Sequence, residues 1–238
     1  MDATNNMMRP HVIMMKVHVN GVDINYEVAG EGSAVILLHG NGEDHHIFDV
    51  LVEELSRTNE VYAIDTRGHG GSSKAEVFHY EDMMEDIKQF IDELKIKKPV
   101  VYGFSDGGII GLMLASKYPD LLSGLIASGP NLTPKDVRFS FRIYMRFQYI
   151  RNKDPLIELM LKEPNITDND LKRITIPTLI TIGSRDMVPL SHGEHIADRI
   201  ENGYLMILDG EDHSSYIVGS DRLYPIISEF MSELEGRM

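Results

Sequence analysis

Hydrophobic and polar positions along the chain alternate between strand-like and helix-like segments. Short apolar runs of strand length, most of them rich in β-branched residues and typical of buried strands, occupy residues 33–40, 60–65, 100–104, 121–128, 176–184 and 204–210. Segments with helical periodicity lie between them, at 47–55, 80–94, directly after 104, at 191–200 and from about 217. Two earlier runs, 12–19 and 22–30, are separated by Asn20-Gly21, a strong hairpin turn signal.

This alternation predicts an α/β fold, with a mostly parallel central sheet covered by helices on both faces. Such sheets bind ligands outside the carboxyl ends of their strands. One stretch, 131–173, is too long for an ordinary connection and carries aromatic and basic residues at helical spacing. We therefore predict a core domain formed by 1–130 and 174–238 and a small helical cap inserted at 131–173.

Composition narrows the classes of protein that need to be considered. The chain has 238 residues, 42% hydrophobic and 25% charged, which fits a globular domain with a substantial core. Its net charge of −14 argues against nucleic acid or an anionic membrane as the main partner. The absence of cysteine excludes disulfides and thiolate chemistry. The N-terminus lacks a leader-like pattern and no run is long enough to span a bilayer, so we expect a cytoplasmic protein.

The sharpest break in the pattern is Gly103-Phe104-Ser105-Asp106-Gly107, a G-x-S-x-G sequence between a strand and a helix. Five residues with three fixed positions would by themselves fit a structural turn. In a strand–turn–helix context, however, such a turn holds the serine hydroxyl out for chemistry, while the glycines avoid clashes between neighbouring elements.

A serine hydroxyl becomes a strong nucleophile only beside a base that is itself oriented by an acid. Asp186 follows the apolar run 176–184, and His213 follows the run 204–210, so both are expected at carboxyl ends of strands. The chain order Ser105, Asp186, His213 is the order of this arrangement on a parallel sheet. Three other acids lie beside His213, but immediate neighbours seldom reach a ring nitrogen with suitable geometry. They are Asp209, Glu211 and Asp212.

Five segments together carry a resemblance to a known family. They are LLHGNG (37–42), DTRGHGGS (65–72), GFSDGG (103–108), GSRDMVP (183–189) and GEDHSS (210–215). In this order and spacing the chain resembles the α/β-hydrolase superfamily over nearly its whole length. The resemblance implies an oxyanion hole made by the backbone N–H groups of Asn41 and Asp106, and structural roles for His39 and His69.

We predict no cofactor and no metal. His45 and His46 are adjacent, and adjacent side chains rarely point together. His192 and His195 lie three apart on a probable helix without a third ligand.

Residues of the predicted cap give the only indication of substrate. Phe139, Ile143, Phe147 and Ile150 form an apolar stripe that we expect to pack over the active-site cleft, and Tyr144 and Phe147 are our candidates for substrate contacts. Arg138, Arg142 and Arg146 form a second stripe. This basic stripe is expected to be a solvated face; the alternative is that one arginine reaches the pocket and favours substrates that carry a carboxylate.

These features predict a serine hydrolase that cleaves small-molecule carboxylic esters through an acyl-enzyme intermediate. A nucleophilic aspartate and the tryptophans of dehalogenases are missing, because residue 105 is Ser and the chain has no Trp. Hydrolysis of C–C bonds, thioesters or lactones, perhydrolysis and lyase chemistry use a similar constellation and stay open. A protein that binds a small ligand without turnover is the remaining alternative. Oligomeric state is not predicted.

Overall fold

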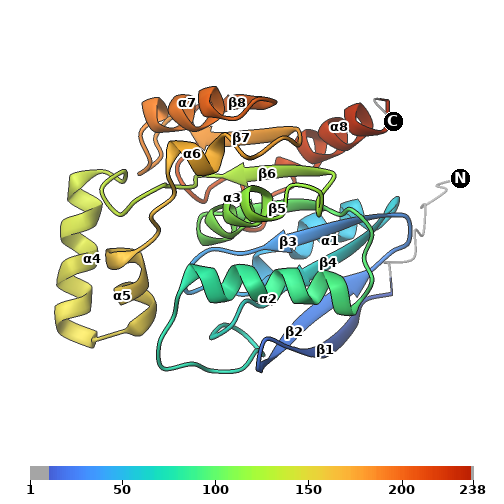
Figure 1. Cartoon of the computed structure of the whole chain (residues 1–238), viewed down its shortest axis with the longest axis horizontal. Coiled ribbons are helices and arrows are strands. Elements are labelled where there is room, and N and C mark those ends of the chain that lie inside the picture. Colours follow the sequence, from blue (N-terminus) through green and yellow to red (C-terminus); the bar gives the residue numbers. More distant parts are fainter. Residues whose placement is uncertain (1–10, 237–238) are drawn as a thin grey trace, which may run out of the picture.

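The computed structural model describes residues 11–236, and within them eight strands form a single sheet in the order β1-β2-β4-β3-β5-β6-β7-β8 (Figure 1). The first ten residues, part of the stretch without a leader-like pattern, lie outside the described residues. The strands are β1 (Ile13–Val19), β2 (Val22–Ala29), β3 (Ser33–Leu38), β4 (Asn59–Ile64), β5 (Val100–Phe104), β6 (Gly124–Ser128), β7 (Thr178–Gly183) and β8 (Gly203–Leu208).

The sheet is mostly parallel, as predicted. From β4 to β8 all neighbouring strands run parallel, whereas β1 and β2 pair antiparallel and β2 joins β4 antiparallel. Asn20 and Gly21, both with positive φ (46° and 77°), make the tight turn between β1 and β2. This backbone matches the two-residue hairpin turns that Asn-Gly favours. The predicted hairpin is therefore confirmed.

Helices cover both faces of the sheet (Figure 1). Alternate strand residues point to opposite faces, so that Ile36 and Leu38 join one hydrophobic cluster with α2, α3 and α7, while Val35 and Leu37 join another with α1 and α8. The core helices are α1 (Asp49–Leu55), α2 (Tyr80–Glu93), α3 (Asp106–Lys117), α7 (Leu190–Arg199) and α8 (Leu223–Glu235), with a short 3-10 turn η1 (His45–Phe48) before α1.

The last helix begins at Leu223, about six residues later than its periodicity indicated. Residues 214–219 instead form a turn, in which the Ile217 N–H donates to the Ser214 carbonyl at 3.0 Å and Gly219 has a φ of 61°. A glycine in that conformation interrupts the helical pattern before α8.

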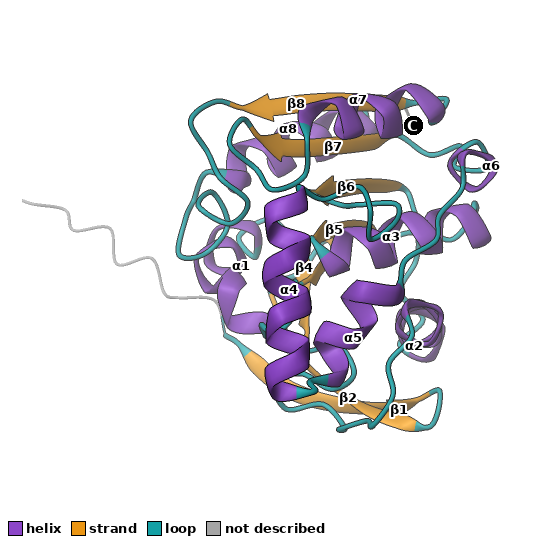
Figure 2. Cartoon of the chain, turned by 90° about the vertical axis from the view of Figure 1, so that its left-hand side faces the viewer, coloured by secondary structure: helices purple, strands orange, loops and turns teal. Residues whose placement is uncertain are grey.

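Residues 131–173 lie between β6 and β7 and stand beside the sheet rather than in it (Figure 2). They carry α4 (Phe139–Asn152), α5 (Pro155–Lys162) and α6 (Asp168–Leu171). Asp154 caps α5, with its side chain accepting from the Leu156 N–H, and Pro155 occupies the first helical position, where its missing N–H costs nothing. Helices α4 and α5 face the carboxyl ends of the parallel strands, whereas α6 contacts α3 and α7.

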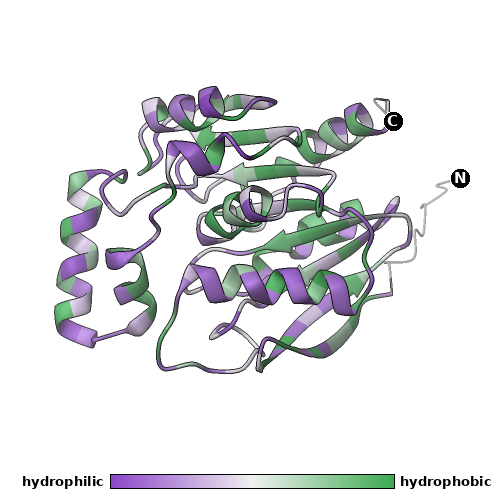
Figure 3. Ribbon diagram, in the orientation of Figure 1, coloured by the Kyte–Doolittle hydropathy of each residue, from purple (hydrophilic) through white to green (hydrophobic). Residues whose placement is uncertain are grey.

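The expected orientation of α4 is wrong. Phe139, Ile143, Phe147 and Ile150 are 54–67% exposed, so this stripe points outward and does not cover the cleft. Figure 3 shows apolar and hydrophilic residues interleaved along α4. The one fully buried residue of α4 is Met145. Helical periodicity correctly grouped these four residues on one side of α4. It does not say whether the apolar stripe or the basic stripe is turned toward the protein.

No helix among the described residues is long and apolar enough to cross a membrane.

Candidate active site

Ser105 stands at the corner between β5 and α3, in the strained backbone conformation φ 51°, ψ −110°. Its N–H donates to the Ser128 carbonyl at 2.8 Å, which fixes the corner against β6. A side chain at Gly103 would collide with the backbone of Gly107, and one at Gly107 would collide with the Leu38 carbonyl. The two glycines are therefore required for the close packing that holds this unfavourable conformation.

The structure brings Ser105, His213 and Asp186 into one chain of hydrogen bonds. The Ser105 Oγ lies 3.1 Å from His213 Nε2, and His213 Nδ1 lies 2.7 Å from Asp186 Oδ1. Asp186 is 1% exposed and also accepts from the Val188 N–H at 2.9 Å. A buried carboxylate bonded to Nδ1 fixes the tautomer in which Nε2 can accept the serine proton.

The neighbouring acids that could have competed for His213 are bonded elsewhere. Asp212 accepts from the N–H groups of Ser214 and Ser215, and Glu211 accepts from the Ser215 hydroxyl and pairs with Arg222. Asp209 accepts from the Ser184 hydroxyl at 3.3 Å. These bonds shape the loop that carries His213.

Gly129 is a site residue that the sequence did not single out. It has a φ of 58°, and a Cβ there would lie 2.8 Å from His213 Cε1 and 3.3 Å from Asp186 Oδ2. This Oδ2 is buried and has no hydrogen-bond partner within the described chain. The imidazole and the carboxylate can thus meet only because residue 129 has no side chain. A glycine directly after a strand was the available signal, but a simple turn gives the same pattern.

Arg138, at the start of α4, holds the loop that carries Asp186. Its Nε donates to the Asp186 carbonyl at 2.8 Å, and its N–H donates to the Met187 carbonyl at 2.9 Å. On the opposite side of His213, the Phe104 ring lies 4.9 Å from the imidazole, centroid to centroid. The His213 imidazole is therefore held by packing as well as by hydrogen bonds.

Asn41 and Asp106 lie beside the serine, with Asn41 in the turn after β3 and Asp106 as the first residue of α3. Within residues 11–236 neither backbone N–H has a hydrogen-bond partner. Their side chains are joined: Asn41 Nδ2 donates to Asp106 Oδ2 at 2.9 Å, and also to the Leu156 carbonyl of α5 at 3.3 Å. Burial raises the pKa of Asp106, and the bond from Asn41 opposes that rise.

His39 and His69 brace the loop between β3 and α1. The Thr66 N–H donates to His39 Nε2 at 3.0 Å, while His39 Nδ1 lies 2.7 Å from the Gly40 carbonyl. Burial lowers the pKa of His39 to about 4, which keeps Nε2 free to accept. His69 Nε2 accepts from the Gly42 N–H at 3.0 Å. Each imidazole thus fixes backbone on one side of Asn41.

Among the described residues, one group of three His, Asp or Glu side chains is close enough to share a metal ion. It consists of Asp44, His45 and His46, whose possible ligand atoms lie within 4.8 Å of one another. His45 Nδ1 is bonded to the buried Asp65 carboxylate at 2.7 Å. Burial alone would raise the pKa of Asp65, but hydrogen bonds from His45, Gly71 and Asn25 hold it well below its usual range. This arrangement braces the loop after β4.

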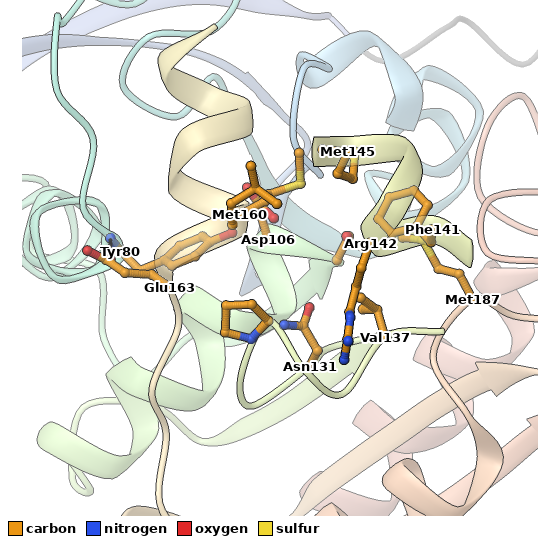
Figure 4. Close-up of a pocket in the computed structure, with 13 residues that line it drawn as sticks. Tyr80, Asp106, Asn131, Val137, Phe141, Arg142, Met145, Met160, Glu163 and Met187 are labelled. Carbon is orange, nitrogen blue, oxygen red and sulfur yellow. Dashed lines mark hydrogen bonds between the residues drawn. The ribbon is translucent and has the colours of Figure 1, made fainter. Parts of the chain in front are cut away.

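A small cavity of about 40 Å³ lies beside Ser105, beneath the cap. Figure 4 shows the residues that line it. Phe141, Arg142 and Met145 of α4 line it, together with Met160 of α5 and Tyr80 of α2. The Tyr80 hydroxyl is buried, and this burial together with the nearby Asp106 carboxyl raises its pKa well above the usual value. The wall is mainly apolar, with the polar groups of Asp106, Asn131, Arg142 and Glu163 among the residues that line it (Figure 4).

Neither predicted substrate contact lines this cavity. Tyr144 and Phe147 are 54% and 62% exposed on the outer side of α4, so that prediction is wrong. Their place is taken by Phe141 and Met145, which lie on the face of α4 turned toward Ser105. Of the three arginines in the basic stripe, Arg142 lines the cavity.

Comparisons with known proteins agree with this fold. The sequence model of the α/β hydrolase fold matches residues 33–156. Human serine hydrolase BPHL is 29% identical over 92% of this chain and 87% of its own length. A thermophilic esterase from Thermogutta terrifontis (22% identity, TM-score 0.77) covers 93% of this chain and 99% of its own. The meta-cleavage product hydrolase of Pseudomonas fluorescens IP01 (23%, 0.76) covers 92% and 97%.

Proposed function

Because this chain belongs to the α/β hydrolase fold family, we propose that it is a serine hydrolase that cleaves carboxylic esters. The observation that carries the proposal is the continuous hydrogen-bonded chain Ser105–His213–Asp186, which ends at a buried carboxylate. The likeness to the human serine hydrolase supports the same class of activity.

In the proposed reaction, His213 Nε2 removes the Ser105 proton as the hydroxyl oxygen attacks the ester carbonyl carbon. Asp186 holds Nδ1–H and stabilises the imidazolium that forms. The imidazolium then gives its proton to the departing alcohol, which leaves an acyl group on Ser105. A water molecule, deprotonated by His213, attacks this acyl group and releases the acid.

The negative charge that develops on the carbonyl oxygen is assigned to the N–H groups of Asn41 and Asp106. The Asp106 N–H lies at the first position of α3, where N–H groups have no intrahelical partner and the helix dipole favours an anion. Removing one such donor typically costs about 10²–10³ in rate. The two imidazoles that brace the Asn41 loop serve this preorganisation.

The apolar wall of the cavity, formed by Phe141, Met145, Met160 and their neighbours, supports an ester with a small or moderate apolar acyl group. All the groups that this mechanism invokes are side chains and backbone N–H groups of this chain, so we propose catalysis without a cofactor.

The test is hydrolysis of p-nitrophenyl esters from acetate to dodecanoate by the wild type and Ser105→Ala. Loss of a triad serine lowers kcat by about 10⁴–10⁶. Ser232→Ala, an exposed serine of α8 remote from the sheet edge, is the matched control and should keep full activity. The chain-length profile would measure how much acyl chain the cavity accepts.

If the wild type cleaves no ester in the series, ester hydrolysis is contradicted, and a serine-reactive phosphonate separates the alternatives. Labelling at Ser105, located by mass spectrometry, would indicate a different reaction of the same triad, such as hydrolysis of a C–C bond, thioester or lactone. No labelling would favour a protein that binds a ligand without turnover.

A further inference from the structure

The outer side of the cap holds a groove of about 620 Å³ next to the catalytic cavity. Four cationic side chains line it, and none of its lining residues is acidic. The cations are Lys135, Arg142, Arg146 and Lys162. In a chain with a net charge of −14, a groove of this sign is exceptional.

The acidic residues nearest this groove in the sequence are already bonded. Glu163, between two residues of the groove, accepts from the Tyr80 N–H at 3.0 Å and lies 2.6 Å from His79 Nδ1. Glu158 pairs with Lys162 at 2.5 Å, and Asp136 accepts from the N–H and hydroxyl of Thr133 at 2.7 and 2.8 Å. Within residues 11–236, no carboxylate pairs with Arg142 or Arg146. The charges of Arg142 and Arg146 are therefore not used in ion pairs within the described residues and are available to a ligand.

Arg142 connects the groove to the chemistry, because it lines both the groove and the cavity above Ser105 (Figure 4). Its Nη1 donates to the Lys135 carbonyl at 3.2 Å, and its guanidinium lies 5.4 Å from the centre of the Phe139 ring. These two contacts hold the guanidinium in place. Its remaining N–H groups are free to bind an anion in the paired geometry that suits carboxylate and phosphate oxygens.

We propose that this groove binds the anionic end of the substrate, a multiply charged phosphate or carboxylate group, while the ester carbonyl lies at Ser105. The proposal rests on the proposed function and adds the substrate class. Phe139 and Ile143, exposed in the same groove, provide apolar contacts for the spacer between the charged group and the ester. Specificity for the charged group would therefore come from Arg142 and Arg146, and Phe147 and Ile150, which do not line the groove, would not contribute.

The first test compares esters with one acyl group and three alcohols: neutral, phosphate-bearing and dicarboxylate-bearing. We expect kcat/KM to be at least about tenfold higher for one of the charged esters, and this preference to shrink as salt rises from 50 to 500 mM because screening weakens exposed charge pairs. Arg146→Glu should remove the preference. Arg151→Glu, also on α4 but outside the groove, should keep it. Which charged ester is preferred separates phosphate from carboxylate.

Equal kcat/KM for all three esters, or an equal loss of preference in both charge-reversal variants, would overturn the proposal while leaving ester hydrolysis intact. A second measurement separates the two hypotheses: calorimetric titration of Ser105→Ala protein with pyrophosphate and with citrate. Binding that Arg146→Glu weakens at least tenfold and Arg151→Glu does not would support the groove even if no ester is cleaved. Binding that both variants weaken equally would mean general charge attraction only, and would contradict it.

Discussion

The carboxyl edge of the sheet and the cap that faces it are constrained in opposite ways. At the sheet edge, Ser105, His213 and Asp186 are placed by close backbone packing and by hydrogen bonds to buried partners. In the cap, α4 buries one residue, Met145, and leaves five large hydrophobic side chains exposed. The reacting groups therefore have little freedom, whereas residues on α4 can change at low cost to stability. We expect the chemistry to reside in the first region and the choice of substrate in the second.

The largest effect should come from placing a side chain where the sheet edge allows none. In Gly129→Ala the new Cβ would lie 2.8 Å from His213 Cε1, so the imidazole must move away from Ser105 or Asp186. Misplacement of a catalytic group by about 1 Å costs on the order of 10²-fold in rate. We expect kcat for the best p-nitrophenyl ester to fall by that factor or more.

Gly219→Ala is the control for Gly129→Ala, because Gly219 has a similar φ (61° against 58°) and no atom within 4 Å of its Cβ position. It carries the same backbone strain without the collision and should keep its activity. Equal losses of kcat in the two variants would show that strain alone, and not crowding of the imidazole, limits residue 129.

A second test of the constrained region is its acid stability, which depends on His39. The pKa of this buried imidazole is lowered from 6.5 to about 4, so its neutral form stabilises the fold fully above pH 6.5. As pH falls from 6.5 to 4 the unfolded chain takes up a proton that folded His39 does not, and about 3 kcal/mol of stability is lost.

His39→Gln isolates this effect. The variant should be less stable than the wild type at pH 7, since the bond from the Thr66 N–H is disturbed. Its free energy of unfolding, measured in urea at pH 7, 5.5 and 4, should fall less steeply with decreasing pH than that of the wild type, because glutamine takes up no proton. The contribution of other titrating groups, such as Asp65, is common to both proteins. Parallel curves for the two proteins would show that His39 is not responsible.

The smallest effect is expected on the outer side of the cap. Phe147→Ala removes an exposed ring and should change the free energy of unfolding by less than about 0.5 kcal/mol and leave ester hydrolysis unchanged. Met145→Ala, two residues earlier, removes a buried side chain that lines the cavity and should cost about 2–4 kcal/mol. Thermal unfolding of both variants makes the comparison, and a larger loss in Phe147→Ala would reverse the assigned orientation of α4.

The parts of the molecule that could be predicted from sequence are those where local pattern and backbone geometry agree. The turn at Ser105, the strands before Asp186 and His213, and the Asn20-Gly21 hairpin each need particular residues at fixed positions. α4 carries two competing stripes, and its inner face mixes Phe141, Arg142 and Met145, so that amphipathicity could not decide its orientation. Gly129 depends on a distant imidazole and carboxylate, a relation that no local pattern contains.

The cap is fastened to the catalytic apparatus at two places. Arg138, before α4, donates to the carbonyl of Asp186, and the Leu156 carbonyl of α5 accepts from the side chain of Asn41, which we propose as part of the oxyanion hole. The pair of helices α4 and α5 is thus bonded both to the loop that carries Asp186 and to the loop that carries Asn41. If the cap moves away to admit a substrate, at least one of these two hydrogen bonds must break. We therefore expect that opening of the cap displaces Asp186 or Asn41 from the arrangement described above.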